Sequence, residues 1–405
     1  MTTEATETTT DTPSIDEEAF DLPQVMTIVG AHFVHDTYSA FLAPLLPVIQ
    51  ERLQSNYQVT GSLAVIPQIP SLLNPFIGYL ADRLSLRYFI ILAPGVTATL
   101  MSVLGLVSTY AALAMLLFAA GISIAVFHAP APAMIAHVAG RRVGKGMSLF
   151  MAGGELGRTI GPLVLVGGIS WFGLEGLWRL AVIGWLTSLV LYFRLRNISA
   201  RPASAQMPSL SEAWERGRDF FLALIWLQIT RVFLMAPLTT YLPLFMTDVV
   251  GVSLELSAAS LTILEAAGVV GALGAGTLSD RVGRLRLLAA LLLIAPALLL
   301  LFVFTPGWMA VPLLILLGLA SISPTPVLLA LVQDYFPDNR ALANGTFLSI
   351  NFLSRAVAIY AVGWMADVFG LANAFLGGAV VAWLSLGAVY WLSRIIGADR
   401  STPIG

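Results

Sequence analysis

The sequence predicts an all-α membrane protein with twelve transmembrane helices arranged as two pseudo-symmetric six-helix bundles. Three observations lead to this fold class. Of 405 residues, 58% are hydrophobic and only 11% are charged, whereas a typical soluble domain is roughly 25% charged. The apolar residues fall into twelve long stretches, and the second half of the chain repeats motifs of the first half at a nearly constant offset.

Each apolar stretch is long enough to cross about 30 Å of hydrocarbon. The stretches cover approximately residues 24–47, 60–80, 88–107, 111–136, 147–170, 177–194, 220–246, 257–278, 287–305, 308–332, 344–366 and 371–393. Several contain Pro or Gly, which membrane helices tolerate because neighbouring helices satisfy the freed backbone groups.

The basic residues predict the orientation of these helices. With a cytoplasmic N-terminus, the cytoplasmic loops and the C-terminal tail hold sixteen Arg or Lys residues, and the outer loops hold only Arg52 and Arg179. This bias indicates that both termini are cytoplasmic. The acidic, Thr-rich start of the chain has neither the basic start nor the apolar core of a secretory signal. We therefore expect a multi-pass protein of the bacterial inner (plasma) membrane.

The longest polar interruption divides the chain into two halves. The predicted parts are a disordered cytoplasmic tail (1–22), an N-terminal six-helix bundle (23–194), a cytoplasmic linker (195–218), a C-terminal six-helix bundle (219–394) and a cytoplasmic tail (395–405). At a shift of 197 residues, Arg158 falls on Arg355. Tandem six-helix repeats are one known plan of secondary transporters.

The repeated motif after the second and eighth stretches resembles the signature of the major facilitator superfamily, Gly-x-Leu-x-Asp-Arg-x-Gly-Arg-x-Arg or close to it. The matching residues are Gly78, Asp82 and Arg83 in the first half and Gly276, Asp280, Arg281, Gly283 and Arg284 in the second. Ser85 and Leu86 depart from the pattern. We expect a conformational gate, in which Gly lets two helices approach and Asp pairs with Arg in one conformation only.

A finer resemblance is to the fosmidomycin resistance proteins, which are drug exporters of that superfamily. It rests on residues 31–36, on Phe127-His128 and on residues 153–162. It implies alternating access, drug efflux and antibiotic resistance. Polar uncharged residues are common in that group where Glu155 and Arg158 stand, so the substrate does not carry over. Gly157-x3-Gly161-Pro162 also partly matches the superfamily's antiporter motif, although glycines for close helix packing are the plainer explanation.

Ionisable residues at membrane depth are the candidates for function, because each costs about 2.5–3.5 kcal/mol. They are His32, His35, Asp36, His128, Glu155, Arg158, Arg231, Glu265 and Arg355. None lies in the third, sixth, ninth or twelfth stretch away from its ends. The resemblance implies the same division: helices 1, 4, 7 and 10 line a cavity, helices 2, 5, 8 and 11 rock around it, and the others face lipid.

Two roles are assigned within this set. Asp36, Glu155, Glu265, His32 and His35 are candidates for proton coupling; His32 and Asp36 share a helix face at i,i+4 spacing. Arg231, Arg355 and Arg158 are expected to converge on an anionic substrate, because guanidinium groups match carboxylate and phosphonate oxygens. His128, Gln228 and Tyr38 complete the expected substrate site.

Structural alternatives stand beside these roles. Glu155 and Arg158 could form a static buried pair, Arg231 could merely pair with Asp36 or Glu265, and His128 could only hydrogen-bond a carbonyl. Two histidines beside an aspartate could also suggest a metal site. No carboxylate-rich cluster completes one, so no metal is expected.

The sequence-based hypothesis is a proton-coupled secondary transporter that exports an anionic or amphipathic drug-like compound. The alternative is a proton-coupled importer of a small organic anion. No nucleophile–base pair points to an enzyme, and a net charge of −2 without a basic tract gives no sign of nucleic-acid binding. The expected partners are a small-molecule substrate and the lipid bilayer, with a monomeric protein and no cofactor beyond the proton gradient.

Overall fold

The computed structural model describes residues 20–73, 77, 87–198, 210–305, 307–336 and 340–399. This part of the chain is helical throughout and contains no β-strand. The predicted tail before residue 20, most of the linker (199–209) and the first-half gate residues Gly78, Asp82 and Arg83 lie outside it.

The N-terminal half contains six helical units, of which the first is divided between α1 (Leu22–Ser39) and α2 (Leu42–Leu53). The second is described as α3 (Tyr57–Val65) followed by the 3-10 helix η1 (Ile66–Leu73). The remaining helices are α5 (Arg87–Ser102), α6 (Tyr110–His128) with α7 (Ala131–Ala139), α8 (Val143–Phe172) and α9 (Ala181–Leu195).

The C-terminal half repeats this order. Its helices are α10 (Leu210–Ala236) continued by η5 (Pro237–Tyr241), α11 (Leu242–Leu244) and η6 (Phe245–Val249); α12 (Leu254–Val282); α13 (Arg284–Val303); α14 (Ala310–Ile322) with α15 (Pro324–Tyr335); α16 (Arg340–Phe369); and α17 (Leu371–Trp383) with α18 (Ser385–Asp399). Ten helical segments of the described chain are long and apolar enough to cross a membrane. They coincide with the last ten predicted stretches.

Proline accounts for the main breaks within these helices. Pro130 separates α6 from α7, and Pro324 starts α15 after α14. Pro237 opens the π-helical turn η5. Proline lacks the N–H that an α-helix needs in its interior, so the helix bends or changes its hydrogen-bond pattern there.

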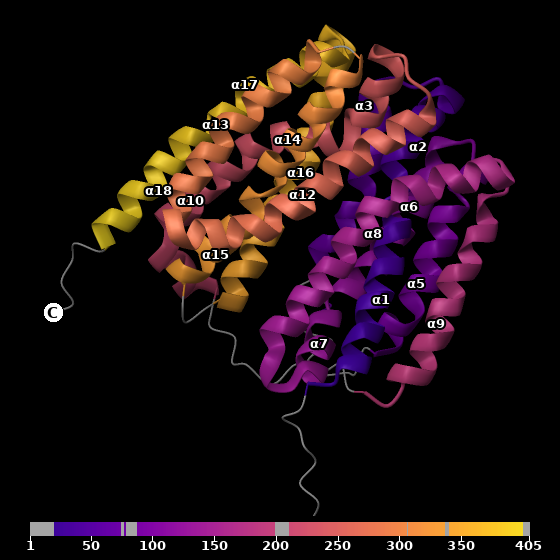
Figure 1. Ribbon diagram of the computed structural model, residues 1–405, viewed down its shortest axis with the longest axis horizontal. Coiled ribbons are helices and arrows are strands. Elements are labelled where there is room, and N and C mark those ends of the chain that lie inside the picture. The colour runs from indigo at the N-terminus through magenta and orange to yellow at the C-terminus, as the bar shows by residue number, and fades with distance from the viewer. Residues whose placement is uncertain are drawn as a thin grey trace, which may run out of the picture.

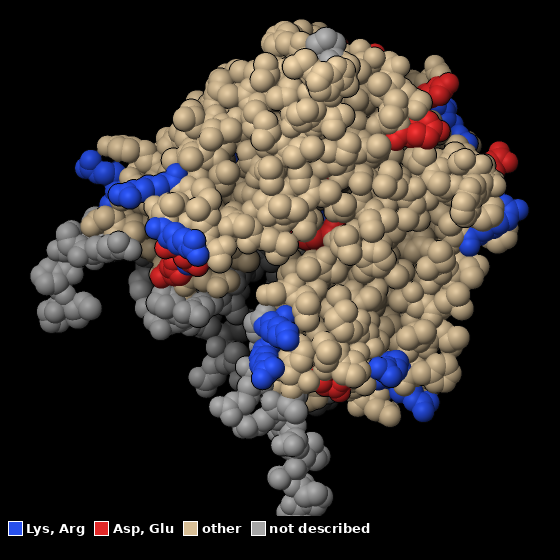
Figure 2. Space-filling view, viewed as in Figure 1, with Lys and Arg blue, Asp and Glu red and all other residues tan. Residues whose placement is uncertain are grey.

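The two bundles lie together at one end of the molecule and diverge toward the other (Figure 1). The buried apolar residues have the same distribution. One core is shared by both halves and includes Leu45, Tyr241 and Leu264. Two further cores each belong to a single half, one around Phe150 and one around Phe220. Among the buried cores of the described residues, only the shared one contains residues of both halves, and Figure 2 shows a recess between the diverging ends.

Two helix pairs make the most extensive contacts between the halves. α8 packs against α12, and α3 packs against α16. These are helices 5, 8, 2 and 11 in membrane order, the four that were expected to rock around the cavity. The diverging ends include the start of α1 and the end of α9 (Figure 1), which the basic residues predict to be cytoplasmic.

Candidate functional site

Glycines on one face of α8 bring that helix into backbone contact with α1. A Cβ atom on Gly157 would lie 2.3 Å from the carbonyl oxygen of Phe33, and one on Gly161 would lie 2.5 Å from that of Thr37. No side chain fits in such a gap, so the i,i+4 spacing of these glycines allows the close packing seen in membrane helices. The packing explanation of the partial antiporter motif therefore accounts for both residues.

This packing brings Asp36 of α1 into a cluster of polar side chains. Its carboxylate is buried, with 2% of the side chain exposed. Arg158 of α8 donates to Asp36 Oδ2 at 2.9 Å, and His35 Nδ1 lies 3.1 Å from Oδ1. The Nε2 atoms of His32 and His128 lie 3.3 Å from Oδ2 and 3.4 Å from Oδ1 respectively. A buried carboxylate needs such partners to stay ionised.

The three histidines are held on the sides away from Asp36. His32 Nδ1 lies 2.8 Å from the carbonyl oxygen of Phe150, and the two rings stack with centroids 3.9 Å apart. His128 Nδ1 lies 2.9 Å from the carbonyl oxygen of Ile124. His35 Nε2 lies 3.1 Å from the hydroxyl of Thr97. These contacts fix the orientation of each ring toward the carboxylate.

Gly154 makes room for the cluster. A Cβ atom there would lie 2.4 Å from His32 Cε1 and 3.0 Å from Asp36 Oδ2. We expect Gly154→Ala to displace the His32 ring and to destabilise the protein by about 1–3 kcal/mol through overpacking. Thermal unfolding of the purified protein and a transport assay in vesicles measure the two effects.

Gly167→Ala is the matched control on the same helix, because a Cβ atom at Gly167 would meet nothing within 4 Å. Alanine is favoured over glycine inside a helix by roughly 0.5–1 kcal/mol, so this variant should unfold no earlier than the parent. Equal unfolding temperatures and equal transport in the two variants would show that the cluster tolerates the extra methyl group.

A second group of charges crosses from α8 to the other half of the molecule. Glu155 and Arg158 form an ion pair within α8. Glu265 on α12 interacts electrostatically with both of them and with Arg355 on α16. Arg355 also donates to the hydroxyl of Thr239 at 3.2 Å. The side chains of Arg158 and Glu155 are 40% and 27% exposed, so this row of charges is open to solvent or ligand.

Arg231 lies apart from these charges. It is 3% exposed and donates to Thr325 Oγ1 at 2.6 Å and to the carbonyl oxygen of Ser321 at 3.4 Å. Gln228 accepts from Arg231 at 3.5 Å and donates to Asn351 at 3.0 Å. No carboxylate of the described residues forms a salt bridge with this guanidinium. The structure thus brings Arg158 and Arg355 together, and it keeps Arg231 as a separate buried cation.

Tyr38, which was expected to line the substrate site, takes a structural position in this conformation. Tyr38 is 2% exposed, and its hydroxyl donates to the carbonyl oxygen of Leu180.

Ligand atoms of His32, Asp36 and His128 lie within 4.8 Å of one another, a spacing that a metal ion could bridge. Arg158 already pairs with the same carboxylate, however, so a metal ion there would compete with this guanidinium for Asp36.

The second-half gate motif is organised by Arg284. This residue donates to Asp334 Oδ2 at 2.5 Å and lies 3.3 Å from Asp280, so it connects the start of α13 to the ends of α12 and α15. Gly283 ends α12 with φ +95°, a conformation that favours glycine. The expected close helix approach at Gly276 is absent: a Cβ atom there would meet nothing within 4 Å in the described structure. Arg281 is exposed.

The opposite end of the molecule is closed by contacts that the sequence did not reveal. Asp367 of α16 accepts from the backbone N–H groups of Tyr57 at 2.7 Å and Gln58 at 3.0 Å, and so caps the first turn of α3 from the other half. The Tyr57 hydroxyl donates to Asp248 at 3.0 Å. We call these contacts the Asp367 latch. Capping across the halves leaves no signal in local sequence.

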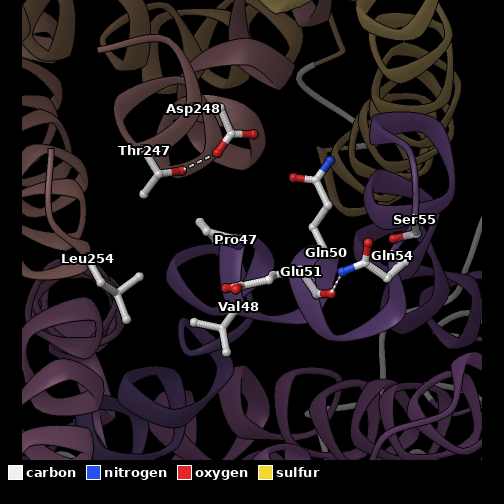
Figure 3. Close-up of a pocket in the computed structure, with 9 residues that line it drawn as sticks. All are labelled: Pro47, Val48, Gln50, Glu51, Gln54, Ser55, Thr247, Asp248 and Leu254. Atoms are coloured by element: carbon white, nitrogen blue, oxygen red, sulfur yellow. Dashed lines mark hydrogen bonds between the residues drawn. The ribbon is translucent and has the colours of Figure 1, made fainter. Parts of the chain in front are cut away.

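A pocket of about 570 Å³ lies beside this latch. It is lined by α2 residues such as Gln50 and Glu51 from one half and by Thr247 and Asp248 from the other (Figure 3). It contains none of the ionisable residues at membrane depth. We therefore place the candidate site at the charges around Asp36, Arg158 and Glu265, which extend from the N-terminal half to α12 of the other half.

Two helical bundles that share one core and carry a row of charges where they meet are typical of a polytopic transport protein. Residues 28–359 match the family model of the Major Facilitator Superfamily. The chain therefore belongs to that superfamily, and it is a multi-pass membrane transporter.

Similar proteins give the same result. The chain is 22% identical to the fosmidomycin resistance protein of Escherichia coli (strain K12), with 84% of this chain and 86% of that protein covered. It is also 22% identical to the uncharacterised MFS-type transporter YfnC of Bacillus subtilis (strain 168), with 86% and 87% covered.

Among solved structures, a bacterial homologue of the human lysosomal transporter Spinster, inward-facing and unoccupied, superposes with a TM-score of 0.79 at 18% identity, covering 94% of this chain and 98% of that one. The nucleoside transporter NupG superposes with a TM-score of 0.70 at 14% identity, covering 93% and 99%. These neighbours confirm the predicted fold of twelve helices in two bundles.

Proposed function

We propose that the protein is a proton-coupled antiporter that exports an anionic or amphipathic drug-like compound by alternating access. The observation that supports this most is the row of charges from Asp36 through Arg158 and Glu155 to Glu265 and Arg355. It joins α1 to α8 and then crosses to α12 and α16, the helices that pack across the two halves. A protonation or binding event on either side of the interface therefore changes the electrostatic attraction between the bundles.

The buried Arg231 and the half-buried Arg355 favour an anionic ligand. Arg231 has neutral partners and no salt bridge among the described residues, and Arg355 donates to a threonine hydroxyl. A buried guanidinium without a carboxylate is costly unless another anion neutralises it. A carboxylate or a phosphonate matches its fork geometry. The E. coli relative is named for resistance to a drug, which favours export.

The test is transport by the purified protein in sealed vesicles with an imposed pH gradient. We expect an organic anion or a drug from a broad panel to move against the proton flux, and dissipating the gradient should stop it. Movement of the anion in the same direction as protons would instead identify an importer. Transport that ignores the pH gradient, or no transport of any anion, would refute the proposal.

We further propose that both termini and the linker face the cytoplasm of a bacterial cell. The chain contains no Cys, so single cysteines report position without background. A membrane-impermeant maleimide should label Ser204→Cys only after the cells are opened, and should label Asn56→Cys in intact cells. The reverse pattern would invert the assigned topology.

The Asp367 latch should hold the outer end closed. Asp367→Asn weakens two charge-assisted hydrogen bonds; because the residue is exposed, we expect an effect of about 1 kcal/mol, roughly a fivefold change in population. A cysteine at the buried position Leu63 should then react faster with an external reagent. Glu51→Gln is the control at the same end, and an equal rate in both variants would assign the latch a packing role only.

A further inference from the structure

The contact between His32 and His128 is not explained by two neutral rings. Their Nε2 atoms lie 3.1 Å apart, within hydrogen-bonding distance. On the far side of each ring, Nδ1 lies 2.8 or 2.9 Å from a backbone carbonyl oxygen. A carbonyl oxygen only accepts, so each Nδ1 carries a proton. If both rings were neutral, each Nε2 would be an unprotonated acceptor.

Two acceptor lone pairs would then face each other at 3.1 Å, and both would also face the carboxylate of Asp36 at 3.3 and 3.4 Å. This arrangement is repulsive throughout. One proton between the two Nε2 atoms removes the repulsion, because one ring becomes a donor to the other and to Asp36. The distance between the nitrogens is that of an N–H···N hydrogen bond.

The surrounding charges favour the same proton. The charged or titratable groups of the described residues around the pair are His35 and Asp36 on α1 and Arg158 on α8, and Glu155 forms an ion pair with Arg158. α5 contributes only the hydroxyl of Thr97, which can donate to His35 Nε2 and leave that ring neutral. Two carboxylates against one guanidinium leave one negative charge, and a single proton on the histidine pair makes the cluster neutral.

We propose that His32 and His128 share one proton, and that this imidazole pair, rather than a carboxylate, binds the proton that drives transport. Asp36 and Arg158 then act as positioning residues that set how strongly the proton is held. This inference rests on the proposed proton coupling. It names the group that takes up the proton, and it predicts that movement of α1, α6 or α8 apart releases it.

The test uses the full chain in liposomes with ¹⁵N-labelled histidine. The protein has only four histidines, of which His137 is exposed and serves as an internal reference. Solid-state ¹⁵N NMR distinguishes neutral imidazole from imidazolium. At a pH where His137 gives the signal of a neutral ring, we expect one imidazolium or shared-proton signal from the other three rings.

Variants identify the source of that signal. His128→Gln and His32→Gln should each remove it, whereas His137→Gln should remove only the reference. The spectrum of the unmodified sequence is decisive even if a variant folds poorly: neutral rings at His32, His35 and His128 would overturn the proposal. A signal that survives in either single variant would overturn the shared proton, and one that survives in both would assign the proton to His35. Stoichiometric bound metal, with ring signals that change when a chelator removes it, would also overturn it.

Transport in the same liposomes keeps the two proposals separate. Gradient-driven transport without a shared-proton signal refutes the histidine pair alone. A shared-proton signal in a protein whose transport ignores the gradient refutes proton coupling, and leaves the pair as a structural feature. Both should fail together only if neither the signal nor the gradient dependence is found.

Discussion

Asp36→Asn is expected to abolish gradient-driven transport and to lower the stability of the protein. The carboxylate contacts Arg158, His32, His35 and His128. Its removal leaves the proton on the histidine pair without its carboxylate and leaves Arg158 with Glu155 as its remaining charged partner. Loss of one partner of a buried pair costs about 3–5 kcal/mol, and we expect the lower end because Arg158 is 40% exposed. Exchange of substrate without a gradient should partly survive.

Two comparisons separate coupling from stability. Glu155→Gln removes the other partner of Arg158 but leaves Asp36 in place, so it should impair gradient dependence with a smaller loss of stability. The double variant with Asp36→Asn and Arg158→Gln removes both charges, and should recover part of the melting temperature without recovering coupling. If Asp36→Asn and Glu155→Gln both transport at the parental rate with the parental pH dependence, neither carboxylate takes part in coupling.

The sequence predicted this region well because its signals are local or repeated. The i,i+4 spacing placed His32 and Asp36 on one face, and the i,i+3 spacing placed Glu155 beside Arg158; both pairs are in contact. The cost of ionisable groups in a membrane pointed to α1, α8, α12 and α16, and the structure places interacting charges on these four helices. The repeat further indicated that Arg158 and Arg355 are equivalent, and the structure brings them into electrostatic range through Glu265.

What the sequence missed is long-range and depends on how helices pack. Arg158 and Asp36 are 122 positions apart in the sequence, and they are in contact because glycines bring α8 onto α1. Gly154 is required because a Cβ atom at this position would collide with His32. The backbone carbonyls that orient His32 and His128 belong to no side-chain pattern. Arg231 was expected to converge with the other arginines. Its partners Thr325 and Ser321 instead hold it inside the C-terminal half.

The arginines of the C-terminal half provide the test that separates an anion site from a structural charge network. If Arg231 and Arg355 hold an anionic substrate, replacing either with Gln removes charge-assisted hydrogen bonds worth about 1.5–3 kcal/mol. The affinity should then fall roughly ten- to a hundred-fold. Lys should restore it only in part, because an ammonium lacks the bidentate fork. Ligand binding and melting temperature, measured on the same purified variants, give the result.

The two arginines should differ in the control, because their surroundings differ. Arg355 interacts with Glu265, so Arg355→Gln leaves a buried carboxylate, and adding Glu265→Gln should restore any lost stability. Arg231 has only neutral partners among the described residues, so Arg231→Gln should keep its melting temperature and lose only binding. Unchanged binding in both single variants, or binding recovered together with stability in the Arg355–Glu265 double variant, would assign these arginines to structure. Lost binding at a normal melting temperature in Arg231→Gln would instead establish that a buried, unneutralised guanidinium recognises the anion.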